Sequence, residues 1–230
     1  MRHRIFIDSI QPAVTVGGDE FHHSVRVVRL REGEEVEVFD RAGKMAHATV
    51  RSIARDHAVL EVGEEIASRE SPFAITLAMA IIQLDKFELV LQKATELGVR
   101  AIIPVVTDRI ELRAERYAGK SERWERILFE AVKQSGRSVV PTIESPAKFD
   151  DIIVHDGTKI LFDADTPPTP GHPGTRATLF IGPEGGFSPR ELQLAQQHQA
   201  TFHQLGPRRL RAETAAIASV AIFAARFGDL

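Results

Sequence analysis

The sequence predicts an α/β protein in which a small β-barrel-like domain precedes a larger domain of alternating strands and helices. Two observations carry this prediction. Before residue 68, short runs of alternating apolar and polar residues are separated by turn residues, as in antiparallel strands. After Pro72, apolar strand-like runs alternate with helical patterns, which is typical of a parallel sheet covered by helices. We therefore expect one domain over residues 1–70 and a second over residues 73–230.

The N-terminal domain is predicted from three strand-like runs and two turns. The runs alternate apolar and polar side chains, as strands with one buried face do. The strands are expected at residues 35–39, 47–50 and 58–62, and the turns at residues 40–43 and 55–57.

A basic stripe precedes these strands. His22, Arg26 and Arg29 are spaced i, i+4 and i+7, so one or two helical turns would place them on one face, opposite apolar residues. Most such faces are ordinary solvated surface, and the glutamates that follow favour that interpretation. The alternative is a surface that contacts nucleic-acid phosphates.

The second domain is predicted from four strands and four helices, one of which starts at the capping box of residues 188–191. One helix has an apolar stripe from Phe87 to Leu97 and stops at Gly98, a typical residue just past a helix end. A second helix starts at Ser121, and a third, over residues 215–225, is apolar on nearly every side. The strands are expected at residues 75–82, 101–106, 159–162 and 177–181.

The first of two glycine-proline turns reads Phe180-Ile-Gly-Pro-Glu-Gly-Gly186. Its glycines permit positive φ angles and a close approach of ligand to backbone, and Ser188-Pro-Arg-Glu191 is a capping box that starts a helix. Neither the phosphate-binding Walker spacing nor the G-x-G-x-x-G dinucleotide spacing is present. The turn is either a ligand-binding loop or a tight turn that simply needs glycine.

The second turn reads Leu205-Gly-Pro-Arg-Arg-Leu-Arg-Ala-Glu-Thr214 and enters the apolar helix. Arginines at the start of so apolar a helix cost folding free energy when they are buried, unless an anionic group pairs with them. The partners are either Glu213 and Glu184 or an anionic ligand. In a parallel sheet, the turns that connect strands to helices bind ligands at the edge where the strands end. The two turns therefore predict one shared pocket. The helix itself predicts a homodimer, since one sheet cannot cover every side of it.

Composition narrows the function classes. The 230 residues contain no cysteine, which excludes disulfides, cysteine-ligated zinc and thiolate catalysis and fits a reducing cytoplasm. The nine histidines show no metal-ligand spacing, so no metal is expected. No apolar run approaches the roughly 20 residues of a membrane span, so we expect a cytoplasmic protein without a membrane partner. The net charge of −3 requires any RNA contact to come from local basic clusters.

The two turns together resemble the RsmE family of SPOUT-class methyltransferases. The matching motifs are Ile181-Gly-Pro-Glu-Gly-Gly186 and Leu205-Gly-Pro-Arg-x-Leu-Arg-x-Glu-Thr214, supported by Gln92-Lys-Ala-Thr-Glu-Leu-Gly-Val99, Gln134-Ser-Gly-Arg137 with Pro141, and Arg226-Phe-Gly-Asp229. The resemblance implies an N-terminal PUA-like RNA-binding domain, a C-terminal SPOUT domain with a deep trefoil knot, and a homodimer. It also implies S-adenosyl-L-methionine as the cofactor and N3 of a uridine in small-subunit (16S) ribosomal RNA, or in the ribosomal subunit, as the target.

The resemblance also implies the site. The expected cofactor-binding residues lie at three strand ends and on the two turns: Leu161, Phe162, Ile181, Gly182, Pro183, Gly185, Gly186, Leu205, Gly206, Leu210, Arg211 and Thr214. The expected RNA-binding residues are basic: His22, Arg26, Arg29, Lys86, Arg137 and Arg208.

Methylation at a uridine N3 requires loss of its proton or stabilisation of the uridine anion. Arg211 is the expected anion-stabilising group. Glu213 or Glu184 is the expected proton acceptor, with the alternative that either carboxylate is an arginine partner or a helix cap.

Three function classes remain open: an RNA methyltransferase, a catalytically idle RNA-binding protein of the same fold, and a protein that binds another RNA or nucleotide-like ligand through the same turns. The intact glycines and the complete Arg-x-Leu-Arg-x-Glu-Thr run favour the first class, because a pure RNA binder has no need of a cofactor pocket.

Overall fold

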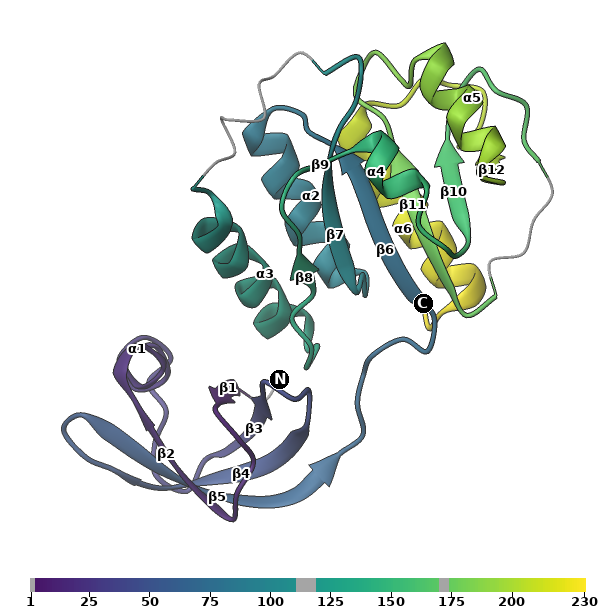
Figure 1. Cartoon of the computed structure of the whole chain (residues 1–230). Helices are drawn as coiled ribbons and strands as arrows, with labels where there is room; N and C mark the ends of the chain where they lie inside the picture. The colour runs from purple at the N-terminus through teal and green to yellow at the C-terminus, as the bar shows by residue number, and fades with distance from the viewer. Residues whose placement is uncertain (1–2, 111–118, 170–173) are drawn as a thin grey trace. The chain divides into compact units, whose positions relative to one another are not determined.

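The computed structural model describes residues 3–110, 119–169 and 174–230, apart from the side chain of Arg26. The chain forms two compact units (Figure 1). Unit 1 consists of residues 1–70 together with residues 132–140, and unit 2 consists of residues 71–131 and 141–230.

Unit 1 is built on a five-stranded sheet in the order β1-β3-β4-β5-β2. β1 runs parallel to β3, and the other neighbouring pairs are antiparallel. Alternating apolar side chains, among them Val36, Val38 and Leu60, form its core, as the sequence pattern predicted. The strands are β1 (His3–Ile7), β2 (Ala13–Gly17), β3 (Glu35–Asp40), β4 (Met45–Ile53) and β5 (His57–Ile66).

The basic stripe lies on a short irregular helix. One α-helical turn, α1 (Gly18–Phe21), continues as the π-helix η1 (His22–Val27). Because the helix ends at Val27 and Arg29 has a left-handed φ of 64°, Arg29 does not continue the helical face that the i, i+4, i+7 spacing predicted. His22 and Arg29 are both exposed, whereas the side chain of Arg26 lies outside the described part of the chain.

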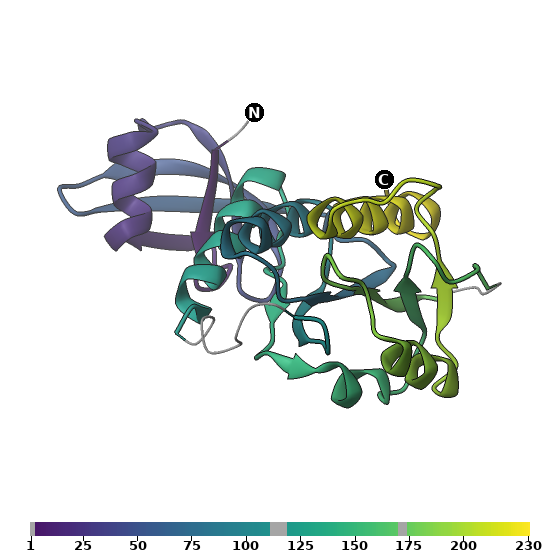
Figure 2. The same ribbon diagram turned by 90° about the horizontal axis from the view of Figure 1, so that it is seen from above.

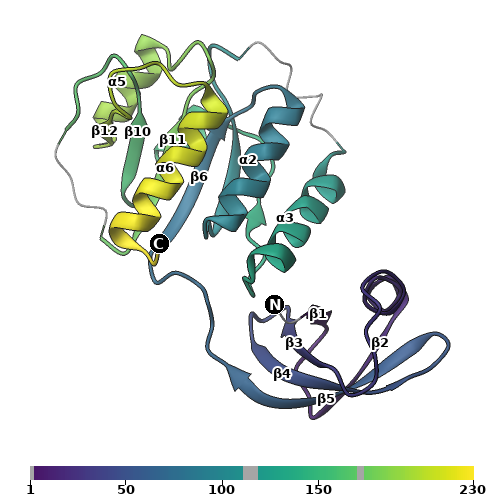
Figure 3. The ribbon, with the colours of Figure 1, turned by 180° about the vertical axis from the view of Figure 1, so that it is seen from behind.

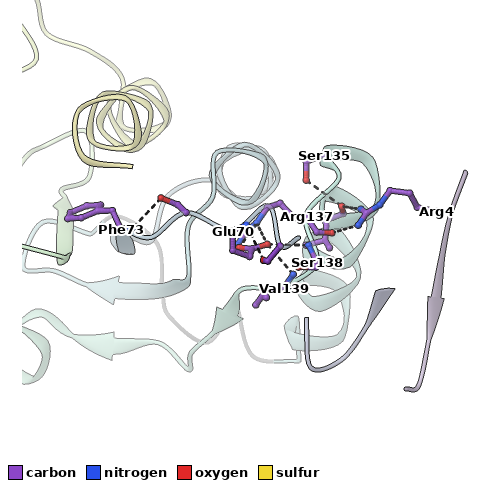
Figure 4. A network of polar contacts seen from close by, with 10 residues as sticks. Arg4, Glu70, Phe73, Ser135, Arg137, Ser138 and Val139 are labelled. Atoms are coloured by element: carbon purple, nitrogen blue, oxygen red, sulfur yellow. Dashed lines mark hydrogen bonds and ion pairs between the residues drawn. The ribbon is translucent and has the colours of Figure 1, made fainter. Parts of the chain in front are cut away.

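Residues 132–140 are held in unit 1 by a buried ion pair (Figure 4). The Arg137 guanidinium donates to Glu70, with Nη2 2.6 Å from Oε2, and both side chains are at most 9% exposed. The backbone N–H groups of Ser138 and Val139 also donate to Glu70 Oε1, each at 3.2 Å. Sequence motifs placed Arg137 among the RNA contacts. In the structure the charge of Arg137 is buried and paired with Glu70 within unit 1, and its contact with RNA stays a prediction.

Two further basic residues reinforce this segment. Arg4, from β1, donates to the carbonyl oxygens of Val132 and Arg137 at 2.9 and 2.7 Å. Lys133 donates to the carboxylate of Glu20 at 2.9 Å. Unit 1 is therefore assembled from two stretches of chain that are far apart in the sequence.

Unit 2 contains a seven-stranded parallel sheet whose main path runs β12-β10-β11-β6-β7-β8, with β9 also paired to β7. The carboxyl ends of its strands therefore meet at one edge, as predicted. The strands are β6 (Ala74–Ala80), β7 (Ala101–Val106), β8 (Thr142–Ile143), β9 (Ala147–Lys148), β10 (Lys159–Phe162), β11 (Arg176–Ile181) and β12 (Thr201–His203).

Helices cover both faces of this sheet (Figures 2 and 3). On one face lie α2 (Leu84–Glu96), α3 (Ser121–Ser135) and α6 (Ala212–Phe227), packed through a core that includes Leu77, Leu91 and Val220. On the other lie α4 (Phe149–Ile153) and α5 (Pro189–Gln197), packed through Phe149, Phe180 and Phe202. This three-layer arrangement fits the predicted α/β class.

α6 has one buried face and one small-residue face. Ala216, Val220 and Phe223 pack on the sheet of the same chain and are at most 1% exposed. Val220 is therefore a core residue of its own chain. The outward face carries Ile222, which is 36% exposed, and on the neighbouring helix α2 Leu89 is 42% exposed.

The connection that leaves β10 is hydrogen-bonded to the segment that ends β12. Thr169 N–H donates to the Phe202 carbonyl at 2.9 Å, and Phe202 N–H donates to Thr169 Oγ1 at 2.8 Å. Gln204 Nε2 donates to the carbonyl oxygens of Ala164 and Thr166. These contacts bring the entry to the last helix against this loop, and the trefoil knot itself stays a prediction.

Within the described residues, none of the helices has the length and apolar character that crossing a membrane requires.

Candidate active site

A pocket of about 500 Å³ lies in unit 2 at the carboxyl ends of β10, β11 and β12. Both glycine-proline turns line it, together with residues 163–166 after β10 and Arg109 after β7. The volume is in the range of roughly 300–1,000 Å³ that is typical of small-molecule sites. The sequence prediction of one pocket shared by the two turns agrees with this geometry.

The first turn is built on glycines that cannot be exchanged freely. Gly186 has a φ of +68°, and its N–H donates to the Pro183 carbonyl at 2.8 Å. A Cβ on Gly182 would lie 3.3 Å from the backbone carbon of Gly186 and from the ring of Phe187. Gly186 is therefore required by backbone conformation and Gly182 by close packing of the turn on itself.

The helix that follows starts as predicted. The Ser188 side chain accepts from the Glu191 N–H, and the Glu191 carboxylate accepts from the Ser188 N–H at 2.7 Å, which completes the capping box. Glu191 also accepts from the Asp108 N–H at 2.9 Å. The start of α5 is thus joined to the loop that follows β7.

Arg190 joins the same loop to α4 by bridging two carboxylates. Its Nη2 lies 2.7 Å from Asp108 Oδ1, and its Nη1 lies 2.8 Å from Asp150 Oδ2. Hydrogen bonds from Arg190 and then from Ser188 hold the pKa of Asp108 below its ordinary value. These contacts fix the loop that carries Arg109.

Arg109 is a pocket residue that the sequence motifs did not reveal. Its Nη1 donates to the Gly185 carbonyl at 2.7 Å, and its side-chain carbons lie 3.6 Å from the position of a Cβ on Gly185. An isolated arginine after a strand has no distinctive pattern in one sequence, so only its placement beside the turn identifies it.

The second turn carries three arginines with different surroundings. Arg209 pairs with Asp165 at 2.7 Å. Arg208 folds back over the turn, with Nη2 3.6 Å from the position of a Cβ on Gly206, and it lines the pocket. Arg211 is the N-cap residue of α6 and is exposed. Among the described residues, neither Arg208 nor Arg211 has an ion-pair partner, so both are available to an anionic ligand.

His203 closes the pocket beside α6. Its ring centroid lies 5.9 Å from that of Phe162 and 5.6 Å from that of Phe223. Burial, and secondarily the charge of Arg226, lower the pKa of His203 from its ordinary value, so the ring is uncharged near neutral pH. His203 therefore adds an aromatic, uncharged wall that the sequence analysis did not include.

Most of the predicted cofactor residues line the pocket: Phe162, Ile181, Gly182, Pro183, Gly185, Gly186, Leu205, Gly206 and Leu210. Leu161 differs, because its side chain is fully buried in the core under α4 and α5 and it is not among the residues that line the pocket. Arg211 and Thr214 lie at the start of α6, are exposed, and are not among the residues that line the pocket.

The two candidate proton acceptors differ in their surroundings. Glu184 lines the pocket and lies 3.7 Å from Lys86 Nζ, which brings two predicted site residues together as an ion pair. Glu213, in the first turn of α6, has a buried Oε2 that finds no hydrogen-bond partner within the described part of the chain.

In the part of the chain that the structure describes, no group of three or more histidine, aspartate or glutamate side chains is arranged to hold a metal ion.

A parallel α/β unit joined to a small β unit defines a two-domain protein, and the glycine turns line a pocket where such sheets bind small ligands. Residues 69–224 match the RNA methyltransferase domain family, and residues 16–63 match the RNA methyltransferase PUA domain family. The chain belongs to the RsmE family of RNA methyltransferases.

Relatives and solved structures agree with this assignment. The chain is 32% identical over 202 residues to Ribosomal RNA small subunit methyltransferase E of Aquifex aeolicus, covering 86% of this chain and 88% of that protein. It is similar to the crystal structure of Ribosomal RNA small subunit methyltransferase E from Neisseria gonorrhoeae bound to S-adenosyl methionine, with a TM-score of 0.89, 30% identity and full coverage of both chains. A methyltransferase from Legionella pneumophila in complex with the same cofactor gives a TM-score of 0.82, 31% identity and full coverage of both chains.

Proposed function

We propose that this protein transfers the methyl group of S-adenosyl-L-methionine to N3 of a uridine in small-subunit ribosomal RNA. The observation that carries the proposal is the pocket between the two glycine turns, in a chain whose relatives are named for the small-subunit RNA and are seen with this cofactor bound. The second candidate is methylation of a different RNA through the same pocket.

The residues of the pocket fit this cofactor. Its volume of about 500 Å³ suits a nucleoside with a short amino-acid tail. Gly186 presents no side chain toward the pocket, and Phe162 and His203 supply aromatic walls for a base. The cofactor supplies a methyl group on a positively charged sulfur, so the protein has chiefly to align donor and acceptor.

The proton on uridine N3 sets the remaining task. We propose that Arg211, exposed at the start of α6, stabilises the negative charge that develops on the base. Glu213 is the better candidate for proton acceptor, because its Oε2 has no partner among the described residues, whereas Glu184 already lies 3.7 Å from Lys86.

The two parts of the chain have different tasks in this proposal. Residues 1–70 position RNA through the basic segment at His22, Arg26 and Arg29, and residues 73–230 hold the cofactor, with Lys86 and Arg208 toward the RNA. Charge reversal at the exposed Arg29 is expected to weaken RNA binding most at low salt, because each lost phosphate contact releases one counterion fewer. Unchanged RNA affinity of the Arg29 variant across a salt series would indicate that the RNA-binding surface lies in unit 2.

The protein is proposed to act in the cytoplasm as a homodimer. The exposed Ile222 on α6 and Leu89 on α2 give an apolar surface for the second subunit.

Calorimetry with S-adenosylmethionine and S-adenosylhomocysteine tests the cofactor part of the proposal directly. Binding of either ligand, with one site in each chain, is the expected result. Absence of binding for both ligands to the folded protein would refute the proposed function. A methylated nucleoside other than 3-methyluridine, formed on another RNA, would support the second candidate.

A further inference from the structure

Asp163 is a carboxylate in the pocket wall that no sequence motif singled out. It follows β10 directly, and β10 lies between β11 and β12, the two strands that lead into the glycine turns. Its backbone N–H donates to the His203 carbonyl at 3.1 Å. Asp163 is thereby fixed between the two turns at the centre of the pocket edge.

One oxygen of Asp163 has a structural task and the other does not. Oδ1 accepts hydrogen bonds from the Asp165 N–H at 3.0 Å and the Thr166 N–H at 2.7 Å, which closes the turn after β10. Oδ2 faces the first glycine turn, because a Cβ built on Gly186 would meet it at 3.9 Å as its nearest neighbour. Oδ2 accepts no hydrogen bond from any described residue.

Asp163 differs from the other carboxylates of the pocket wall because no described cation pairs with it. The wall carries two other carboxylates, and each has a cation nearby: Asp165 pairs with Arg209 at 2.7 Å and Glu184 lies 3.7 Å from Lys86. Asp163 has no ion-pair partner among the described residues and is only partly exposed. A partly buried carboxylate without a counter-charge gains most from a cationic ligand group, which makes stronger hydrogen bonds than a neutral hydroxyl.

We propose that Asp163 Oδ2 binds the positively charged methionine portion of S-adenosylmethionine. The pocket would then bind ligands that carry this positive charge more tightly than ligands that lack it. This inference rests on the proposed function. It assigns Asp163 to cofactor recognition, a role separate from the adenine and ribose contacts expected of the glycine turns.

Asp163→Asn is the sharp test, because asparagine keeps Oδ1 as an acceptor for the turn and removes only the charge. Three probes separate the parts of the cofactor. S-adenosylmethionine carries a sulfonium and an ammonium group, S-adenosylhomocysteine carries only the ammonium group, and 5′-methylthioadenosine carries neither but keeps adenine and ribose. Asp156→Asn, an exposed carboxylate before β10, is the charge-matched control.

The affinity of Asp163→Asn for S-adenosylmethionine, measured by calorimetry, is expected to fall by about tenfold or more. Its affinity for 5′-methylthioadenosine is expected to match that of the wild type and of Asp156→Asn. The loss for S-adenosylhomocysteine shows which charge is bound: an equal loss identifies the ammonium group and a much smaller one the sulfonium.

Two results would overturn the inference. An equal loss for all three probes would assign Asp163 to the ribose or to the shape of the pocket. Unchanged affinity in Asp163→Asn, with a loss only in Asp163→Ala, would limit the residue to closing its own turn. Failure of the wild-type protein to bind any probe is a different result and refutes the proposed function instead.

Discussion

Gly186 combines a backbone requirement with a position in the pocket. Its φ of +68° is a conformation that side chains disfavour, and a branch there would extend toward Asp163 across the pocket. Gly186→Val is expected to abolish measurable binding of S-adenosylhomocysteine by calorimetry while costing only about 1–2 kcal/mol of the free energy of unfolding.

Gly98→Val provides the matched control for Gly186→Val. Gly98 also has a positive φ, +92°, but nothing lies within 4 Å of the added Cβ and it is outside the pocket. A similar loss of stability with normal cofactor binding is expected. Normal binding of S-adenosylhomocysteine by a folded Gly186→Val protein would show that the first turn is not part of the cofactor site.

Arg211 is expected to serve the reaction more than the binding of cofactor. It is exposed at the N-cap of α6 and is not among the residues that line the pocket. Arg211→Ala should lower kcat for methyl transfer by about tenfold or more, with a smaller change in cofactor affinity. Arg176→Ala, an exposed arginine at the other end of the sheet in β11, is the control. Equal losses of kcat and cofactor affinity would reassign Arg211 to binding.

Single residues show where sequence reasoning stops. The glycines, the capping box at Ser188 and most of the pocket lining could be predicted, because turn conformation and helix starts depend on neighbours in the sequence. Arg109 and Asp163 could not be predicted, since their contacts come from strands that are distant in the sequence. The pairing of Arg137 was missed for the same reason: its partner Glu70 is 67 positions away.

At the scale of elements, the residue 132–140 segment and unit 1 depend on the buried pair between Arg137 and Glu70. Arg137→Met would leave the Glu70 charge buried without its partner, which typically costs about 3–5 kcal/mol of the free energy of unfolding. Urea unfolding measures this loss, and Arg137→Met with Glu70→Gln should recover part of it. A loss below about 0.5 kcal/mol would show that the pair does not stabilise the fold.

The same pair predicts a pH dependence. Burial raises the pKa of Glu70, but the hydrogen bond and charge of Arg137 and two backbone N–H groups outweigh it, so the pKa lies below its ordinary value. A carboxyl with a lowered folded pKa stabilises the protein above its unfolded pKa, and that stabilisation disappears as the pH falls through the folded value.

The difference in unfolding free energy between wild type and Glu70→Gln should therefore be largest near neutral pH and shrink as the pH is lowered through the folded-state pKa of Glu70. A difference that does not change with pH over this range would contradict the assignment.

The strands show a similar contrast. Local patterns found β3, β4 and β5 of unit 1 and β6, β7, β10 and β11 of the parallel sheet, and β7 and β10 have the predicted bounds. β2 and β12 were not predicted as strands. β1 was not predicted as a strand, because it is defined by its parallel pairing with β3, some 30 residues later. The short strands β8 and β9, of two residues each, are too brief for any periodicity to appear.

At the scale of the whole molecule, the proposed dimer places the outer face of α6 in the subunit contact. Light scattering is expected to give twice the 25.5 kDa mass of one chain. Ile222→Glu should shift the mass toward one chain without unfolding it, because Ile222 is 36% exposed, whereas Val220, fully buried, would test only the core. Val154→Glu, 47% exposed at the end of α4, is the control and should stay dimeric. A wild-type mass near 25.5 kDa would refute the dimer.

The central claim is that this protein methylates a uridine at N3 in small-subunit ribosomal RNA. Its most direct test uses small ribosomal subunits from cells that lack the protein, incubated with purified protein and S-adenosylmethionine labelled in the methyl group. The RNA is then digested to nucleosides and analysed by mass spectrometry. We predict that the label appears in 3-methyluridine at one position of the small-subunit RNA and that this nucleoside is missing there before incubation. Label in another nucleoside, or no transfer by a protein that binds the cofactor, would contradict the claim.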